Sequence, residues 1–511
     1  MGAPMANIIG IDLGTTNSCA AVVDDKGQVK LIPYKGGEYT IPSIYAVDDK
    51  GNELVGHEAK RQWQLNPRKT VYGAKRLIGQ PFQGELVNKM SEYFAYDMKP
   101  GTEDNVLIGL GRNDMNLTQV SSKILDKIRT VAADYLQKPI KKAVVTVPAY
   151  FNDRQRQAVK EAGKMIDLEV VRIINEPTAA ALAYGVQRNV NQTIAIYDLG
   201  GGTFDISVIE IRGKTFEVKS TGGDIFLGGI DWDNAVIDYV LEDFKAKNNV
   251  DLRQDPIAMQ RIKDLAERTK IDLSARQEAP FNIPFVTMTA EGEPLDIDLI
   301  LTRQKINELT AHLVERTIGI TKQVLEDAKL PVTKLDEILL VGGQTRWPAV
   351  QEAVLKFFGK PPSKHVNPDE AVGIGAAIFA HSLETDAVDQ RIQLLDVLSR
   401  AIGIEDAKGA MYKIFERNSP VPNQKSQLFT TSQDDQHEVI MRIYQGESQK
   451  AQQNQQLGEF TFSGLRPGRS GSVRVDVLFD VNSEGILTMS AKDRDTGKEA
   501  KTTVKVESGE A

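Results

Sequence analysis

The sequence predicts two related α/β lobes followed by an all-β domain. From residue 7 to about 383, strand-like apolar runs alternate with long amphipathic helices, a pattern typical of layered α/β architecture. Within this region the stretch IGIDLGTTNSC (9–19) is repeated in similar form by IAIYDLGGGTFDIS (194–207). Short β-rich runs separated by Gly, Pro and Asn occupy residues 399–506, which favours an antiparallel sandwich.

Length and composition narrow the class of protein. A chain of 511 residues is too long for one ordinary core, and about two to four domains are expected. Lys and Arg total 62 against 70 Asp and Glu, so the net charge of −8 argues against nucleic acid as a partner. The single cysteine, Cys19, excludes an intrachain disulfide and favours a cytoplasmic location. We expect no membrane partner, because no uncharged apolar run approaches the roughly 18 residues that a span needs.

In each copy of this internal repeat an apolar strand ends with an aspartate, which is Asp12 in the first copy and Asp198 in the second. A glycine-containing turn follows each aspartate, and glycines bring backbone amides close to phosphate oxygens because they have no Cβ. Two matched turns predict two lobes that face each other across a cleft and bind a metal and a nucleotide. A tight turn without a ligand is the alternative interpretation of each turn.

The elements between the two turns follow from periodicity. Residues 119–137 predict a helix with one apolar face, and AVVTV (143–147) predicts a buried strand. Pro148 ends that strand, and Asn152 or Asp153 is expected to cap the helix that follows.

The later segments alternate in the same way. LVGGQTRWPAV (340–350) predicts a strand, a Gly-Gly turn and a helix start against which a base or ribose can lie. NPDEAVGIGAA (367–377) favours a helix packed closely on another helix. Residues 384–398 fit neither a long helix nor an alternating strand, so they are interpreted as an interdomain linker, and the Gln-rich piece 449–456 as a loop.

Several motifs in a fixed order identify a family. The N-terminal ones are IGIDLGTTNSC, VPAYFNDRQRQA, INEPTAAALAYG, YDLGGGTFDIS, LVGGQTRWP and NPDEAVGIGAA, and the later ones LLDV, YQGE, LGEFTFSGL and FDVNSEGILTMSAKDRDTGKE. Together they resemble the 70-kDa heat-shock chaperones of bacterial DnaK type over essentially the whole chain. The resemblance implies an actin-like or hexokinase-like twin-lobed ATPase domain over 1–383, a linker over 384–398 and a β-sandwich peptide-binding domain over 399–511.

The resemblance also implies roles for individual residues, with ATP or ADP and Mg²⁺ as cofactors. Asp12 and Asp198 would hold Mg²⁺ through its waters. The phosphates would be contacted by Gly14, Thr15, Thr16, Asn17, Gly200, Gly201, Gly202 and Thr203. Thr203 is also counted in the catalytic group, with Lys75, Glu176 and Asp205. The adenosine would be framed by Glu267, Lys270, Gly342, Gly343, Arg346 and Asp369.

A further set of residues would couple the two domains. The resemblance makes Pro148 and Arg156 an interlobe relay, although Pro148 alone, without the family, is better explained as a strand stop. The surface and linker residues that a J-domain co-chaperone would engage are Arg172, Asn175 and Asp396, and Leu394 and Leu395 of the linker are also assigned to the coupling. A nucleotide-exchange factor and unfolded or extended apolar peptides are the other implied partners.

The sequence departs from the family pattern in three places. Gln393 interrupts the apolar linker, and LSRAIG lacks the usual Thr-Pro, so weak docking of the linker is expected. At the peptide cleft, the arch residues Ala407 and Ser432 differ from the family, whereas the other lining positions stay apolar. Those positions are Ile404, Phe429, Val439, Met441 and Val475. The chain stops after VKVESGEA, so we expect no helical lid.

Two other classes of function remain open at this point. A small-molecule kinase or filament-forming ATPase could use the same twin-lobed fold, although it would not need residues 399–506. A regulatory scaffold could keep the fold and bind peptide independently of ATP.

Overall fold

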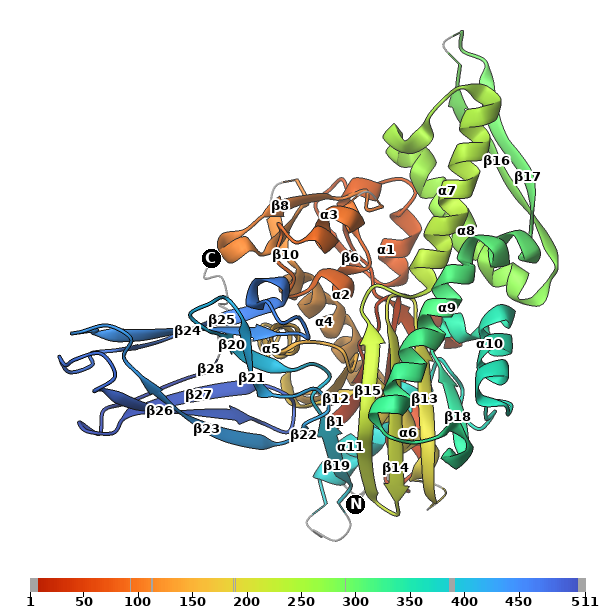
Figure 1. Ribbon diagram of the computed structural model, residues 1–511. Coiled ribbons are helices and arrows are strands. Elements are labelled where there is room, and N and C mark those ends of the chain that lie inside the picture. The colour runs from red at the N-terminus through yellow and green to blue at the C-terminus, as the bar shows by residue number, and fades with distance from the viewer. Residues whose placement is uncertain are drawn as a thin grey trace.

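The computed structural model describes residues 8–91, 93–111, 114–186, 188, 190–289, 291–385 and 391–503. Its two α/β lobes stand side by side, and a β domain projects from the first lobe beside α5 and β12 (Figure 1). The first seven residues and the final VKVESGEA fall outside the described ranges. None of the helices within those ranges is long and apolar enough to cross a membrane.

The first lobe is built on a mixed sheet in the order β12-β11-β1-β2-β3, with β4 also paired to β2. Its strands are β1 (Ile8–Asp12), β2 (Asn17–Val23), β3 (Val29–Leu31), β4 (Thr40–Pro42), β11 (Lys142–Val147) and β12 (Glu169–Asn175). Above it lie β5 (Tyr45–Val47), β6 (Glu53–Val55), β7 (Thr70–Val71), β8 (Asp97–Pro100), β9 (Val106–Gly109) and β10 (Asp114–Asn116). The helices of this lobe are α1 (His57–Gln62), α2 (Ala74–Leu77), α3 (Glu85–Ser91), α4 (Leu117–Leu136), α5 (Asp153–Lys164) and α6 (Glu176–Gly185).

The second lobe repeats the pattern with a sheet in the order β18-β13-β14-β15-β19-β22. Its strands are β13 (Asn191–Leu199), β14 (Phe204–Arg212), β15 (Thr215–Asp224), β18 (Glu337–Val341), β19 (Gln393–Val397) and β22 (Pro420–Val421), and a separate hairpin is formed by β16 (Glu278–Met288) and β17 (Pro294–Thr302). The helices are α7 (Gly229–Asn248), α8 (Pro256–Ala275), α9 (Arg303–Asp327) and α10 (Pro348–Phe358). The chain then returns to the first lobe, because α11 (Ala371–Leu383) packs on the sheet of that lobe.

The pairing of strands confirms that the two copies of the internal repeat have the same structure. β1 runs antiparallel to β2 and parallel to β11, and β13 runs antiparallel to β14 and parallel to β18. Each aspartate strand therefore occupies the same place in its own sheet. The carboxyl ends of these strands meet at the edge where ligands bind in α/β folds.

The two helices predicted between the glycine turns are present as α4 and α5. On the predicted apolar face of α4, Val120, Ile124 and Ile128 are buried and Val131 is partly buried, whereas Tyr135 near the end of the helix is exposed. At α5 the cap is Asn152, whose side chain and that of Gln155 satisfy each other's backbone N–H groups. The other candidate cap, Asp153, is instead the first residue of the helix.

The predicted close packing of residues 367–377 is confirmed by α11. A Cβ added to Gly375 would lie 1.7 Å from the carbonyl oxygen of Ala179 in α6, and one added to Gly10 would lie 2.1 Å from the backbone of Ala377. Only glycine permits both approaches. α11 thus packs against β1 of the first lobe and against α6, and α6 in turn contacts β13 and β14 of the second lobe.

The expectation that Gln393 weakens docking of the linker is wrong. Residues 393–397 form β19, which pairs in parallel with β15 and places Gln393 opposite Thr215. The Gln393 backbone donates to the Lys214 carbonyl at 3.0 Å, while its side chain is exposed. Because the amide stays in water, the polar residue costs the strand no desolvation.

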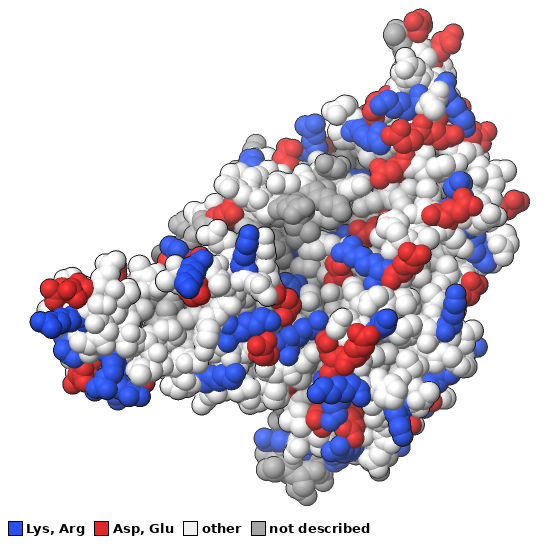
Figure 2. Space-filling view, in the orientation of Figure 1, with Lys and Arg blue, Asp and Glu red and all other residues white. Residues whose placement is uncertain are grey.

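The β domain is a sandwich of two four-stranded antiparallel sheets. One sheet contains β20 (Ile402–Glu405), β21 (Met411–Phe415), β24 (Glu438–Gln445) and β25 (Gln455–Ser463), and the other β23 (Asn423–Thr430), β26 (Arg474–Val481), β27 (Leu487–Asp493) and β28 (Glu499–Thr503). Alternate residues of both sheets fill a shared apolar core. On the face shown in Figure 2, basic and acidic side chains are interspersed over this domain and both lobes.

Candidate functional site

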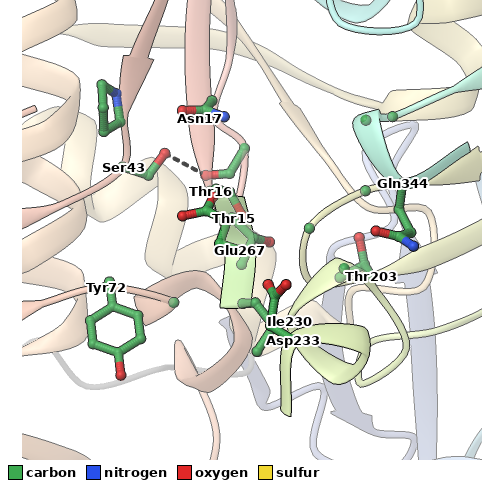
Figure 3. Close-up of a pocket in the computed structure, with 18 of the residues that line it drawn as sticks. Thr15, Thr16, Asn17, Ser43, Tyr72, Thr203, Ile230, Asp233, Glu267 and Gln344 are labelled. Atoms are coloured by element: carbon green, nitrogen blue, oxygen red, sulfur yellow. Dashed lines mark hydrogen bonds between the residues drawn. The ribbon is translucent and has the colours of Figure 1, made fainter. Parts of the chain in front are cut away.

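A cavity of about 540 Å³ lies between the lobes where the two aspartate strands end. Asp12 lines it from the end of β1, and Asp198 lines it from the corresponding end of β13. Figure 3 shows Thr15, Thr16 and Asn17 on one side of this space and Thr203 and Gln344 on the other. The other predicted site residues in the lining are Gly14, Lys75, Glu176, Gly200, Gly201, Glu267, Lys270, Gly342, Gly343, Arg346 and Asp369.

The glycine turns of the two lobes touch each other across the cavity. A Cβ on Gly201 would lie 2.0 Å from Thr16 Oγ1, and one on Gly202 would lie 2.5 Å from Thr15 Cγ2. Backbone N–H groups and hydroxyls of both lobes therefore crowd into one small region. Such a region suits phosphate oxygens, which accept several hydrogen bonds at once.

A buried ion pair, Lys75 with Glu176, forms part of the cavity lining. Lys75 Nζ, from α2, donates to Glu176 Oε1 at 2.5 Å, and both side chains are at most one-tenth exposed. The ring centroid of Phe151 lies 5.7 Å from the same ammonium. A charged lysine held at this depth, beside two further carboxylates, can offset negative charge that develops on a reacting phosphoryl group.

The predicted catalytic residue Asp205 lies behind the cavity wall rather than in its lining. Its Oδ1 accepts a hydrogen bond from the Tyr150 N–H at 3.1 Å, and Oδ2 has no partner among the described residues. Asp205 stands directly opposite Asp198 in the β13–β14 hairpin. An orphaned carboxylate oxygen in a buried position indicates a place for a water or a cation.

Burial governs the electrostatics of the carboxylates. It raises the pKa of Asp12 to about 7 and that of Asp205 to about 8, and the negative charge of Glu176 adds to both shifts. The pKa of Asp198 is also well above its ordinary value, chiefly through burial. Concentrating like charges in this way is unfavourable without a cation to offset them.

The donor set fits Mg²⁺ held through water. Two carboxylates, Asp12 and Asp198, face the cavity, and Thr146 Oγ1 fixes one of them by donating to Asp12 Oδ1 at 3.1 Å. Within the described ranges no group of three or more His, Cys, Asp or Glu side chains forms a direct metal cage. Mg²⁺ usually keeps several of its waters and needs only one or two carboxylates.

The other end of the cavity carries the residues expected around adenosine. Lys270 Nζ pairs with Asp233 at 2.8 Å and donates to the Gly229 carbonyl at 2.9 Å. Arg346 lies half-exposed and pairs with Asp369 at 2.6 Å. These contacts fix charged and planar groups at the edge of the cavity, where a base and a ribose can lie against them.

Sequence reasoning missed Arg76, which is fully buried beside Lys75. Its Nε donates to the Gly202 carbonyl at 2.8 Å and its guanidinium pairs with Asp231 at 2.5 Å. It thus ties the first lobe to the phosphate turn of the second. Adjacent basic residues usually face solvent on a short helix, so the sequence held no signal for its burial.

The proposed coupling residues meet where the β domain lies against the first lobe. Arg156 donates to Asn175 Oδ1 at 2.8 Å, and Asn175 Nδ2 donates to Asp396 Oδ2 at 2.8 Å. Arg172 donates to the carbonyl of Ser483 at 3.3 Å. Leu394 lies opposite Phe216 of the second lobe and packs partly buried against that apolar cluster, whereas Leu395 is 44% exposed. Pro148 is buried directly after β11.

Two acidic residues in this contact were also missed. Glu484 of the β domain accepts the N–H of Ile173 at 2.9 Å and pairs with Lys160. Asp153 accepts the N–H of Leu487 at 2.9 Å from the opposite direction. A carboxylate from each side therefore accepts a hydrogen bond from a backbone amide of the other. The sequence cannot indicate these contacts, because Glu484 lies in an ordinary polar turn and Asp153 at an ordinary helix start.

The structure places the predicted peptide-binding positions at two depths. Ile404, Met441 and Val475 are buried in the core of the sandwich, and Phe429 and Val439 pack half-buried against that core. The arch residues Ala407 and Ser432 are exposed. Phe429 and Val439 are therefore the more accessible of these apolar positions, since the other three are covered.

Comparison with known proteins places this geometry in a family. A family model described as Hsp70 protein matches residues 8–511. The chain is 46% identical over 510 residues to the chaperone protein DnaK of Buchnera aphidicola subsp. Schizaphis graminum (strain Sg), a match that covers 99% of this chain and 79% of that relative. The chain therefore belongs to the Hsp70 family.

Proposed function

We propose that the cavity between the lobes binds Mg-ATP through its two aspartates and two glycine turns. The observation that carries this assignment is the convergence of both strand ends and both turns on a single cavity of about 540 Å³. Asp12 and Asp198 hold the waters of Mg²⁺, which neutralises charge on the β- and γ-phosphates. The adenosine lies against Gly342, Gly343 and Arg346, with Glu267, Lys270 and Asp369 around it.

Hydrolysis is assigned to the buried group around Lys75. Lys75 orients the attacking water and offsets negative charge in the transition state, and Glu176 fixes the ammonium in place. Asp205 and Thr203 complete the group from the second lobe. Arg76 keeps the two lobes at the separation that this arrangement needs, since it bonds to the Gly202 carbonyl.

As a member of the Hsp70 family, the chain is an ATP-dependent chaperone. It binds ATP or ADP with Mg²⁺, hydrolyses ATP and binds unfolded peptide segments. We assign the peptide site to the β domain, with Phe429 and Val439 at its surface and Ile404, Met441 and Val475 beneath. The arch is formed by Ala407 and Ser432.

Coupling between the sites is assigned to the contact of the β domain with the first lobe. Arg156, Asn175 and Asp396 form a hydrogen-bonded chain from the lobe to β19. We extend the assignment to a J-domain co-chaperone that engages Arg172, Asn175 and Asp396, to a nucleotide-exchange factor, and to a cytoplasmic location. Pro148 and Leu394 support the chain of contacts by packing.

Release of a labelled apolar peptide on addition of ATP tests this assignment. A chaperone releases the peptide faster with ATP than with ADP. A small-molecule kinase would not bind the peptide, and a regulatory scaffold would bind it equally with either nucleotide. The matched control is Leu395→Ala, because this linker side chain is exposed while its neighbour Leu394 packs on the lobe.

A further inference from the structure

Arg400 of the β domain stacks on a tyrosine of the first lobe. Its guanidinium carbon lies 4.2 Å from the ring centroid of Tyr150, and its Nη2 donates weakly to the Tyr150 carbonyl at 3.5 Å. No carboxylate among the described residues forms an ion pair with Arg400. A guanidinium over an aromatic face is attractive, and its planar shape makes this contact one that lysine does not reproduce.

The other side of Tyr150 reaches the catalytic group. Its N–H donates to Asp205 Oδ1 at 3.1 Å, and Asp205 is only 1% exposed. The next residue, Phe151, places its ring 5.7 Å from Lys75 Nζ. Residues 148–151 thus connect a surface contact of the β domain with two members of the proposed hydrolytic site.

The same segment is held within its own lobe by Arg156, which donates to the carbonyls of Ala149 and Phe151 at 3.1 Å each. The Ala149 carbonyl and the Tyr150 N–H belong to one planar peptide unit, so Arg156 also helps to orient this N–H. The Tyr150 ring, by contrast, is contacted by Arg400. Arg400 fixes the ring from one side and Asp205 fixes the N–H from the other. Because a hydrogen bond to a carboxylate is directional, small rotations at Tyr150 change the orientation of Asp205.

We propose that Arg400 is a positioning residue for ATP hydrolysis, acting through Tyr150 on the orientation of Asp205. The inference rests on the proposed role of Asp205 in hydrolysis. Arg400 lies in LSRAIG, the segment that departs from the family pattern, and it meets Tyr150 only while the β domain lies against the first lobe. Hydrolysis therefore senses that contact directly.

A double-mutant cycle in the full chain tests the proposal. The variants are Arg400→Leu, Tyr150→Ala and both together, and the measured quantities are kcat and KM for ATP without peptide. Each single change is expected to lower kcat about threefold with KM unchanged, since orientation serves the transition state rather than binding. The double variant is expected to be no slower than either single variant, because both changes remove the same contact.

Two further variants distinguish the Arg400–Tyr150 contact from the other contacts between the β domain and the lobes. Arg417→Leu removes another contact between the domains, with Asp327 at 3.1 Å, without touching Tyr150. Its effect should simply add to that of Tyr150→Ala, whereas Tyr150→Phe should keep the parental kcat because it keeps the ring. Additive losses in the Arg400 cycle, or an unaltered kcat in Arg400→Leu, would overturn the inference. Absence of turnover in the parent chain would instead contradict the proposed function.

Discussion

Lys75 Nζ lies 2.5 Å from Glu176 Oε1 in a site that almost no solvent reaches. Because the ammonium serves the transition state more than bound ATP, Lys75→Ala should lower single-turnover hydrolysis by a factor of about a hundred or more. The affinity for ATP, measured by equilibrium binding, should change by a few-fold at most.

The control for this variant is Lys69→Ala, which removes a more exposed lysine paired with Asp49 at 3.6 Å. Its hydrolysis should match that of the parent chain. Retained turnover in a clean Lys75→Ala preparation would contradict the catalytic assignment.

Tryptophan fluorescence should report nucleotide binding through two of the three tryptophans. Trp63 and Trp347 line the cavity, whereas Trp232 is fully buried outside the lining. ATP should change the emission of the parent chain and of Trp232→Phe. The double variant Trp63→Phe with Trp347→Phe should be silent, and a full signal from it would place the nucleotide elsewhere.

Gln393→Leu should leave ATP-induced peptide release unchanged, because the Gln393 side chain is exposed and only its backbone pairs with β15. Exposed substitutions usually shift stability by less than about 0.5 kcal/mol. Leu394→Ala should weaken coupling, since Leu394 packs on the lobe. Peptide release kinetics measure both, and stronger coupling in Gln393→Leu would show that the amide is buried in the working state.

Peptide dissociation should be fast in the parent chain and slower in Ala407→Met with Ser432→Ala. The two arch residues are exposed, and a methionine at position 407 would bury extra apolar area worth about 0.8 kcal/mol per CH₂. The expected effect is a several-fold lower dissociation rate of a fluorescent heptapeptide with a central leucine, followed by stopped flow. Hydrolysis without peptide should be unaltered. A rate that does not respond to the double change would rule out the arch argument.

The contact between the domains should weaken as the pH rises from about 4 to about 7. Burial raises the pKa of Asp153 to about 7 against an ordinary value of 3.8, even though the Leu487 N–H, Gln157, Arg156 and Arg154 all favour the charged form. The proton is therefore held more tightly in the docked state. Docking is strongest below the lower pKa and loses this contribution as the pH rises towards the higher one.

Small-angle X-ray scattering of the full chain with ATP measures this change as a larger radius of gyration at higher pH. Asp153→Asn keeps an oxygen that can accept the Leu487 N–H but does not titrate. The dependence on pH should be shallower in this variant, and an identical curve would assign the effect to other carboxylates such as Asp396.

The fold was largely predictable because it depends on repeated local patterns. Alternating apolar runs, the paired Asp-Leu-Gly turns and the cap at Asn152 each carry a signal within a few residues of chain. The positions that line the cavity followed from the family motifs. In contrast, Arg76, Glu484 and Arg400 make contacts across more than a hundred residues of sequence, and a lone charged residue carries no sign of its distant partner.

The linker shows a different limit. Gln393 looked unfavourable because an amide in an apolar run costs free energy when it is buried. In a strand successive side chains point to opposite faces of the sheet, so the Gln393 side chain can face water while that of Leu394 packs. The type of residue alone did not reveal which face position 393 occupies.

Gly201 lies against Thr16 and Gly202 against Thr15, so the size of the residue at each glycine sets how closely the two lobes can approach. An added methyl group at either glycine would overlap a threonine of the opposite lobe. Alanine there would act as a spacer that holds the cleft ajar while leaving every charged group of the site in its own lobe. Such a variant would keep every charged group of the site, but its cleft could not close. Alanine at these two positions would therefore separate nucleotide binding from the closure of the lobes that follows it.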